Sequence, residues 1–299
     1  MTEIYKKYFN PKILSRVAAL ELKARQVVAG IVSGLHKSPY HGISVEFARH
    51  REYVQGDEIR HIDWRVYARS DRFYIKQYEE ETNMRCYVML DTSESMLYKS
   101  KKTTKLEYGS LLAASLSYLL LQQRDSCGLV TFDDQVKSYI PPRNNPKHFR
   151  LMLRELELAK PGMKTDIGKI FHDMAERIKK RGLVIIISDL FSDIETTMKG
   201  LAHFKHRRHE VIVFHILDRA EITFPFRDMT LFKGLEGKGD VLAEAWSLRD
   251  GYLENFKKFE EALKGGCLGK KIDYVQMITD EPIDLKLSKY LTARIGRRK

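Results

Sequence analysis

Two kinds of apolar pattern alternate along the chain from residue 83 onwards. Short runs such as LVIIIS (183–188) are apolar at consecutive positions, which is typical of strands that are covered on both faces of a parallel sheet. Longer segments carry an apolar residue at every third or fourth position, which is typical of amphipathic helices. The patterns predict strands at 85–90, 127–132, 136–140, 183–188, 211–217 and 273–278, and helices at 105–123, 147–159, 167–181, 194–208, 248–264 and 284–295.

This alternation predicts an α/β fold with a doubly wound, mostly parallel sheet flanked by helices. We expect residues 136–140 to form an antiparallel edge strand after a tight turn at Asp133–Asp134. Earlier in the chain, residues 11–35 predict one helix, and residues 36–82 contain short strand-like pieces and turn signals. We therefore expect two domains, a small N-terminal helix-plus-loop/β subdomain at 1–82 and the α/β domain at 83–299.

Composition supports a folded protein in a reducing compartment. Apolar residues make up 43% of the chain, which is enough for a packed core and excludes wholesale disorder. The three cysteines show no C-x-x-C spacing, which argues against a disulfide framework or a zinc ribbon. The longest apolar-rich run, residues 111–121, is shorter than the roughly 20 residues that a membrane span needs. We expect a cytoplasmic protein without a targeting segment or membrane span.

The net charge of +12 admits an anionic partner but does not identify one. Residues 46–72 look at first like a nucleic-acid contact, since arginines and aromatic residues are interleaved there. The same stretch holds six arginines and six acids, so its net charge is zero, whereas a phosphate-binding strip needs an excess of positive charge. We expect pairing of arginine with carboxylate within this segment, and a basic nucleic-acid-binding protein is kept as an alternative.

Oxygen-bearing side chains follow the predicted strands. In an open parallel sheet, ligands bind beyond the carboxyl ends of the strands, so residues that follow different strands meet at one rim. DTSESM (91–96) follows the first strand of the α/β domain, an aspartate follows 183–188, and a threonine lies in PGMKTDIG just before the helix at 167. These positions predict a divalent-cation site made of Asp91, Ser93, Ser95, Thr165 and Asp189.

Hydroxyl and carboxylate oxygens suit Mg²⁺ or Mn²⁺, and the absence of Cys and His from the set argues against zinc. The alternative is that DTSES and Thr165 only cap helices, because Asp, Ser and Thr are preferred there. Asp133, Asp134 and Asp218 also follow strands, but solvation in turns and loops accounts for them.

Enzymatic motifs are incomplete in this sequence. HEVIVFH (209–215) lacks the spacing of H-E-x-x-H, and GCLGKK (266–271) lacks the spacing and hydroxyl residue of a phosphate-binding loop. An aspartyl-phosphate mechanism needs a second acid two residues after Asp91, where this chain has Ser93. We expect a protein that is not an enzyme, and a metal-dependent phosphoester hydrolase is kept as an alternative.

At DTSESM, Thr165 and ISD (187–189), the chain resembles the von Willebrand factor A-like fold and its metal-ion-dependent adhesion site. A longer similarity, from about residue 11 to residue 294, joins it to the bacterial family called "domain of unknown function 58". The motifs that carry this similarity are GISVEFARHREYVQGDEIRHIDWRVYARSDRFYIKQYEEET, KLEYGSLLAASLSYL, GLVTFDD, PPR and LVIIISDL. Many relatives carry N-terminal membrane helices, and this sequence resembles the branch that lacks them.

The resemblance implies a role for each predicted ligand. Ser93, Ser95 and Thr165 would coordinate the cation through side-chain oxygens, Asp91 and Asp189 would act directly or through bound water, and one coordination position would stay open for a Glu or Asp of a protein partner. Adhesion sites often have Gly two residues before the Thr, where this chain has Met163. The family is typically encoded beside MoxR-type AAA+ ATPases. The resemblance therefore implies an adaptor that works with such an ATPase in protein assembly or chaperone-like activation.

Overall fold

The computed structural model describes residues 11–36, 50–54, 64, 67, 69, 72–76, 84–162, 167–234 and 239–297. The chain divides into two compact units. The main unit comprises Met1–Lys37 and Met84–Lys299, and the second unit is Ser38–Asn83.

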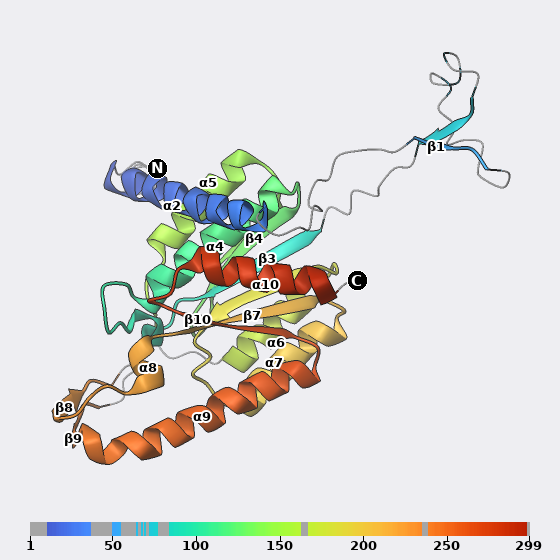
Figure 1. Ribbon diagram of the computed structural model, residues 1–299. Helices are drawn as coiled ribbons and strands as arrows, with labels where there is room; N and C mark the ends of the chain where they lie inside the picture. Colours follow the sequence, from blue (N-terminus) through green and yellow to red (C-terminus); the bar gives the residue numbers. More distant parts are fainter. Residues whose placement is uncertain are drawn as a thin grey trace. The chain divides into compact units, whose positions relative to one another are not determined.

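A six-stranded sheet in the order β10-β7-β6-β3-β4-β5 forms the centre of the main unit (Figure 1). Five of its strands are parallel, and β5 pairs antiparallel with β4 at one edge. The predicted doubly wound sheet with its antiparallel edge strand is therefore confirmed. The strands are Arg85–Asp91 (β3), Ser126–Phe132 (β4), Val136–Arg143 (β5), Leu183–Ser188 (β6), Glu210–Leu217 (β7) and Asp273–Ile278 (β10).

Helices cover both faces of this sheet, and each face has its own apolar core. Alternate residues of β3 enter different cores: Val88 and Leu90 join one, whereas Tyr87 and Met89 join the other. This double burial explains why the strands are apolar at consecutive positions. Across the described residues, no helix combines the length and the apolar character needed to cross a bilayer. The first core includes Pro11–His36 (α2), Lys105–Gln122 (α4), Pro146–Leu158 (α5) and Ile283–Arg297 (α10), and the second includes Ile167–Arg177 (α6), Ile194–His206 (α7) and Ala245–Gly269 (α9).

Helix α2 belongs to the main unit, which corrects the domain boundary expected at residue 82. It packs against α4, α5 and α10, and Leu20, Ala24 and Ile31 are buried in their shared core. The second unit therefore begins at Ser38 rather than at the N-terminus. In that unit, His50–Glu52 (β1) pairs antiparallel with Tyr74–Lys76 (β2). The stretch 46–72 lies largely outside the described residues, so the expected pairing of its arginines with its acids stays a prediction.

Two short elements after β7 were not predicted from the sequence. Helix α8 (Arg219–Thr223) follows β7 directly, and the strands Met229–Phe232 (β8) and Val241–Glu244 (β9) pair antiparallel as a separate hairpin. Phe232 of the hairpin stacks on Phe224, the residue that ends α8, with 5.8 Å between the ring centroids. Apolar residues elsewhere on the hairpin are exposed, namely Met229, Leu231, Val241 and Leu242.

Glycines allow helices α6 and α7 to approach closely. A Cβ atom at Gly168 would lie 2.8 Å from Cβ of Thr196 and 2.9 Å from its carbonyl oxygen. We expect Gly168→Ala to lower the free energy of unfolding by about 1–2 kcal/mol, because this overpacking outweighs the better helix propensity of alanine. Gly251 is the matched control, since an added Cβ there meets no atom within 4 Å, and Gly251→Ala should stabilise α9 by about 0.5–1 kcal/mol. Urea titration measures both values, and equal stability of the two variants would contradict the prediction.

Candidate functional site

The two predicted aspartates lie side by side at the carboxyl rim of the sheet. Asp91 is the last residue of β3, and Asp189 follows β6, which is the neighbouring parallel strand. Both residues are buried, with exposed fractions of 0% and 1%. Burial, together with the nearby charge of Asp189, raises the pKa of Asp91 from 3.8 to about 7. Two neighbouring buried carboxylates destabilise the folded state when both are ionised, so a positive charge at the rim is stabilising.

Hydroxyl groups surround the Asp91 carboxylate. Ser188 donates its hydroxyl to Oδ2 of Asp91 at 2.5 Å, and the backbone N–H of Ser93 donates to Oδ1 at 2.9 Å. The hydroxyl oxygens of Ser93 and Ser95 lie 2.9 Å apart. Ser93 stands at the N-cap position of the short 3₁₀ helix Glu94–Leu97, but its side chain makes no capping hydrogen bond. Helix capping therefore does not account for the Ser93 hydroxyl.

Thr165, the fifth predicted ligand, lies outside the described residues, as do its neighbours from 163 to 166. The residue that precedes this segment is placed beside the rim: Gly162 forms a parallel bridge with Ser93 and donates its N–H to the carbonyl oxygen of Thr92 at 2.9 Å. A Cβ atom at Gly162 would overlap the carboxylate of Asp133, so glycine is required for this approach. Asp133 itself is 0% exposed and pairs with Lys137 at 3.0 Å, so burial and an ion pair account for it rather than the solvation expected in a turn.

Lys105 was missed by the sequence analysis. Its ammonium group lies 2.7 Å from Oδ2 of Asp189 and 2.7 Å from Oε1 of Glu221, and its side chain is 0% exposed. The ring of Phe191 lies beside it, with 4.8 Å from Nζ to the ring centroid. Burial alone would lower the pKa of Lys105, but the charges of Asp189 and Glu221 outweigh burial and raise it. Lys105 is therefore a charged group inside the protein.

One signal in the sequence points to Lys105. It is the first residue of α4, directly after the N-cap Thr104, where the helix dipole disfavours a cation. Glu107 and Thr104 form a capping box that already provides the favourable contacts of this helix start. A lysine at such a position needs another reason, and the structure provides it in the carboxylates of Asp189 and Glu221.

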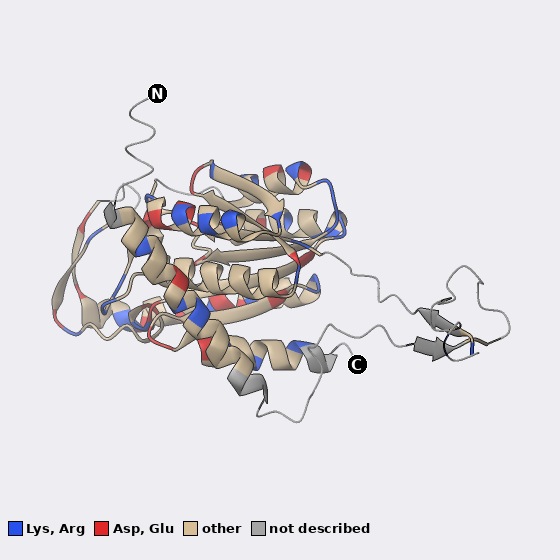
Figure 2. Ribbon diagram, turned by 90° about the horizontal axis from the view of Figure 1, so that it is seen from above, with Lys and Arg blue, Asp and Glu red and all other residues tan. Residues whose placement is uncertain are grey.

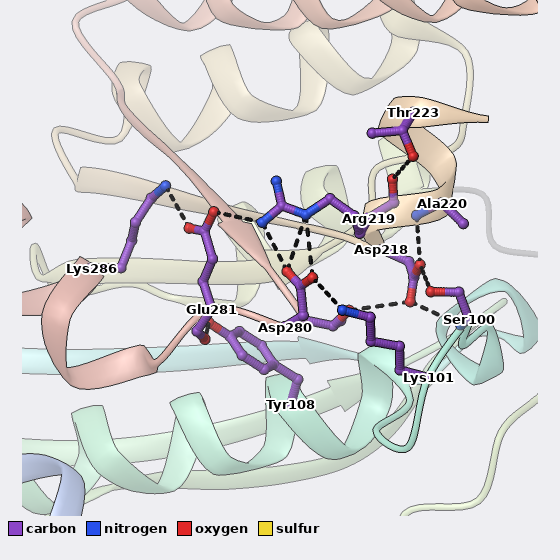
Figure 3. A network of polar contacts seen from close by, with 11 residues as sticks. Ser100, Lys101, Tyr108, Asp218, Arg219, Ala220, Thr223, Asp280, Glu281 and Lys286 are labelled. Carbon is purple, nitrogen blue, oxygen red and sulfur yellow. Dashed lines mark hydrogen bonds and ion pairs between the residues drawn. The ribbon is translucent and has the colours of Figure 1, made fainter. Parts of the chain in front are cut away.

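Glu221 and Asp218 hold α8 next to the rim. Asp218 is the N-cap of α8 and accepts a hydrogen bond from the N–H of Ala220 at 2.8 Å, while Glu221 accepts one from the N–H of Asp218 at 2.7 Å. Asp218 also accepts hydrogen bonds from the N–H and the hydroxyl of Ser100 and from the hydroxyl of Thr279 (Figure 3). Asp218 is thus a buried structural residue, which corrects the expectation that solvation in a loop accounts for it.

A neutral histidine supports the loop that carries Asp189. Nε2 of His215 lies 2.9 Å from the carbonyl oxygen of Asp189, and Nδ1 lies 2.5 Å from the hydroxyl of Tyr274. Burial lowers the pKa of His215 to about 4, so the ring is neutral at pH 7. Because a carbonyl can only accept, Nε2 carries the proton and Nδ1 accepts from Tyr274. The ring nitrogens are thereby committed to hydrogen bonds and fix the backbone at Asp189.

The donor set fits a hard divalent cation. Two carboxylates, Asp91 and Asp189, and two hydroxyls, Ser93 and Ser95, offer oxygen atoms of the kind that Mg²⁺ and Mn²⁺ prefer. Within the described residues, no group of three or more His, Cys, Asp or Glu side chains could hold a metal, so a cation here would depend on the serine hydroxyls. Lys105 is a cation already placed at this rim, and it pairs with one of the two carboxylates.

The surface around the rim is hollow on one side and mixed in charge. A cavity of about 480 Å³ lies beside it, lined in part by Thr92, Asp133, Lys137, Lys160 and Gly162. Lysines and arginines are interspersed with acids along the helices of the main unit (Figure 2).

Comparisons with known proteins agree with the similarity found from the motifs. Residues 49–261 match the model of a family described as "Protein of unknown function DUF58". The uncharacterized protein Rv1480 of Mycobacterium tuberculosis is 24% identical over 221 residues, which cover 72% of this chain and 68% of that protein. The uncharacterized protein YeaD of Bacillus subtilis is 26% identical over 128 residues, which cover 43% of this chain and 30% of that protein.

Solved structures are also similar to this chain. The conserved hypothetical protein BatB from Bacteroides thetaiotaomicron has a TM-score of 0.48 and 13% identity, with 71% of this chain and 99% of that chain covered. The SpRpn10 VWA domain has a TM-score of 0.37 and 12% identity, with 70% of this chain and 94% of that chain covered.

Proposed function

Since the chain belongs to the DUF58 family, as its match over residues 49–261 shows, we propose that it is an intracellular, divalent-cation-dependent protein-interaction module rather than an enzyme. The observation that carries the proposal is the rim itself. The Ser93 and Ser95 hydroxyls lie 2.9 Å apart, directly after a buried aspartate that adjoins a second one. Hard oxygen donors are gathered here around two buried carboxylates, of which Asp189 is paired with Lys105, whereas Asp91 has no cationic partner among the described residues.

The residues of the rim have separate roles in this proposal. The hydroxyls of Ser93 and Ser95 bind the cation directly, and Asp91 and Asp189 offset its charge directly or through water. Thr165 supplies a further oxygen. The bound cation would act as the attachment point for a carboxylate, because neutral hydroxyls leave part of its charge free for an incoming acid.

The partner in this proposal is a protein that presents a Glu or Asp side chain. The cavity beside the rim offers room for a segment of the partner, and its lining combines Lys137 and Lys160 with Asp133 and Glu155. An AAA+ ATPase of the MoxR type is the partner that the family resemblance implies. Co-purification tests this directly: the ATPase should be retained by the immobilised protein in Mg²⁺ and released by chelator, and retention that ignores chelator would contradict cation dependence.

Cation binding can be tested without the partner. A ligand at 100 times its Kd stabilises the folded state by about 2.7 kcal/mol, so saturating Mg²⁺ should raise the Tm of the protein by about 5–10 °C. Asp91→Asn should remove this rise, because it removes one of the two carboxylates while keeping the shape of the side chain. Thermal unfolding in Mg²⁺ and in chelator measures the difference.

Asp134→Asn provides the matched control. Asp134 also follows a strand, but its side chain is 49% exposed, pairs with Lys137 and is not among the predicted ligands. It should keep the full response to Mg²⁺. The same rise in Asp91→Asn as in the wild type would count against the site.

A further inference from the structure

Lys105 forms ion pairs at the same rim, and the five predicted ligands do not account for its presence there. An ammonium group that is fully buried is stable only when carboxylates compensate it, and Lys105 has two, Asp189 and Glu221, each at 2.7 Å. Asp189 is also one of the two carboxylates proposed to offset the divalent cation. One side chain therefore has two competing cationic partners.

We infer that Lys105 is a tethered competitor of the divalent cation: its ammonium group pairs with Asp189 when no cation is bound and is retained by Glu221 when a cation binds. The inference rests on the proposed function, since it concerns how the rim accepts its cation. It assigns to Lys105 and Glu221 the setting of cation affinity, a role that the five predicted ligands do not have.

Electrostatics requires a competition of this kind. A dication drawn to Asp189 and the ammonium of Lys105 repel each other, and the repulsion is strong because both would lie in a buried, weakly screened site. The two oxygens of Asp189 are unequally held. Oδ2 faces Lys105 at 2.7 Å, whereas the hydrogen bond that Oδ1 accepts from a described residue is a long one, 3.3 Å from the N–H of Phe191. A cation that approaches Oδ1 therefore breaks a weak hydrogen bond, but it also weakens the ion pair between Oδ2 and Lys105.

Glu221 makes the exchange feasible. Its Oε1 already binds Lys105, and its Oε2 is held by the N–H of Asp218 at 2.7 Å, so the carboxylate stays in place when Lys105 leaves Asp189. The ammonium then keeps one full ion pair and the ring of Phe191 beside it. Lys105 therefore keeps a carboxylate partner in both states, so the exchange does not leave its buried charge uncompensated.

The test compares the Mg²⁺ dependence of thermal unfolding in the wild type, Lys105→Met and Glu221→Gln. In Lys105→Met the competitor is gone and Asp189 and Glu221 lack compensation. Its Tm in chelator should fall, its rise in Tm with Mg²⁺ should exceed that of the wild type, and its half-saturating Mg²⁺ concentration should fall at least tenfold. In Glu221→Gln, Lys105 depends on Asp189 alone, so the half-saturating concentration should increase several-fold.

These opposite shifts separate competition from a purely structural role. If Lys105 only stabilised the fold, both variants would lower the Tm without moving the Mg²⁺ dependence in opposite directions. Lys101→Met is the control, because Lys101 is 67% exposed and pairs with Asp280, and it should behave as the wild type. If Lys105→Met folds only in Mg²⁺, that dependence itself supports the inference, and Glu221→Gln supplies the affinity measurement.

The outcomes for the two proposals are distinct. If the wild type responds to Mg²⁺ and Lys105→Met responds at an equal or higher Mg²⁺ concentration, the inference is overturned and the proposed function stands. A response in Lys105→Met alone supports the inference, since the lysine then blocks the site in the wild type. No response in any of the proteins overturns both.

Discussion

Replacement of Asp218 by alanine should lower the free energy of unfolding by about 3–4 kcal/mol. Its carboxylate accepts hydrogen bonds from Ser100, Ala220 and Thr279, and it is 1% exposed. These groups belong to three separate segments, so one side chain joins the loop before α4, the start of α8 and the end of β10 (Figure 3). Hydrogen bonds to a buried charge contribute about 1.5–3 kcal/mol, and loss of an N-cap costs about 1 kcal/mol more.

The effect of this substitution should depend on pH. Burial alone would raise the pKa of Asp218, but the hydrogen bonds from Ser100, Ala220 and Thr279 outweigh it and lower the pKa. A carboxylate with a lowered pKa stabilises the folded state above its unfolded pKa of about 3.9, and this contribution is lost as the pH falls through the folded pKa. Urea titrations at neutral pH and in acid should therefore show a smaller difference between wild type and Asp218→Ala in acid.

Asp280→Ala is the control for Asp218→Ala. Asp280 pairs with Arg219 and Lys101 in the same network, but at the surface, where ion pairs contribute about 1 kcal/mol or less. A loss at Asp280 as large as the loss at Asp218 would contradict the view that burial decides the difference.

Phe171→Ala should have an effect of similar size or larger, about 3–5 kcal/mol. Phe171 is 0% exposed and lies between Phe132 and Phe204, with 5.9 and 6.0 Å between the ring centroids. It joins α6 and α7 to the face of the sheet in the second core, and its removal leaves a cavity that the closely packed helices cannot fill. Urea titration should show a lower midpoint with an unchanged slope.

Leu285→Ala tests whether burial or only apolar character matters. Leu285 is 67% exposed on α10, so its replacement should change the free energy of unfolding by no more than about 0.5 kcal/mol. A larger loss there than at Phe171 would mean that the described burial is wrong.

The sheet and most helices could be predicted because their signals are local. Runs such as LVIIIS become strands with alternate residues buried on opposite faces, as their consecutive apolar positions indicate. The end of α9 was predicted wrongly at residue 264, because two glycines follow there. The helix continues to Gly269 since Cys267 is buried, and Gly266 allows close approach to Met198, whose Sδ would lie 2.5 Å from an added Cβ. Tertiary packing overrides the local preference of glycine at this position.

The candidate site could be predicted only where its residues follow strands. Asp91 and Asp189 were placed on one rim because β3 and β6 are parallel, and the structure has them as neighbours. Lys105 was not found, because Asp189 and Glu221 are 84 and 116 residues away in the chain. Long-range charge pairs leave no periodic trace in a sequence. The N-terminal helix was likewise assigned to the wrong unit, because its partners α4, α5 and α10 are distant in the chain.

The contact between α2 and α10 has a consequence for how the protein is made. These helices approach at Gly30, where an added Cβ would lie 2.8 Å from Oδ2 of Asp284. Helix α2 leaves the ribosome first, and α10 follows after roughly 250 more residues, which at about 5–20 residues per second takes on the order of 10–50 s. During that interval the part of α2 that faces α10 stays in contact with water. This layer therefore closes only once α10 has been synthesised, and a nascent chain stalled before α10 should be a target for holding chaperones.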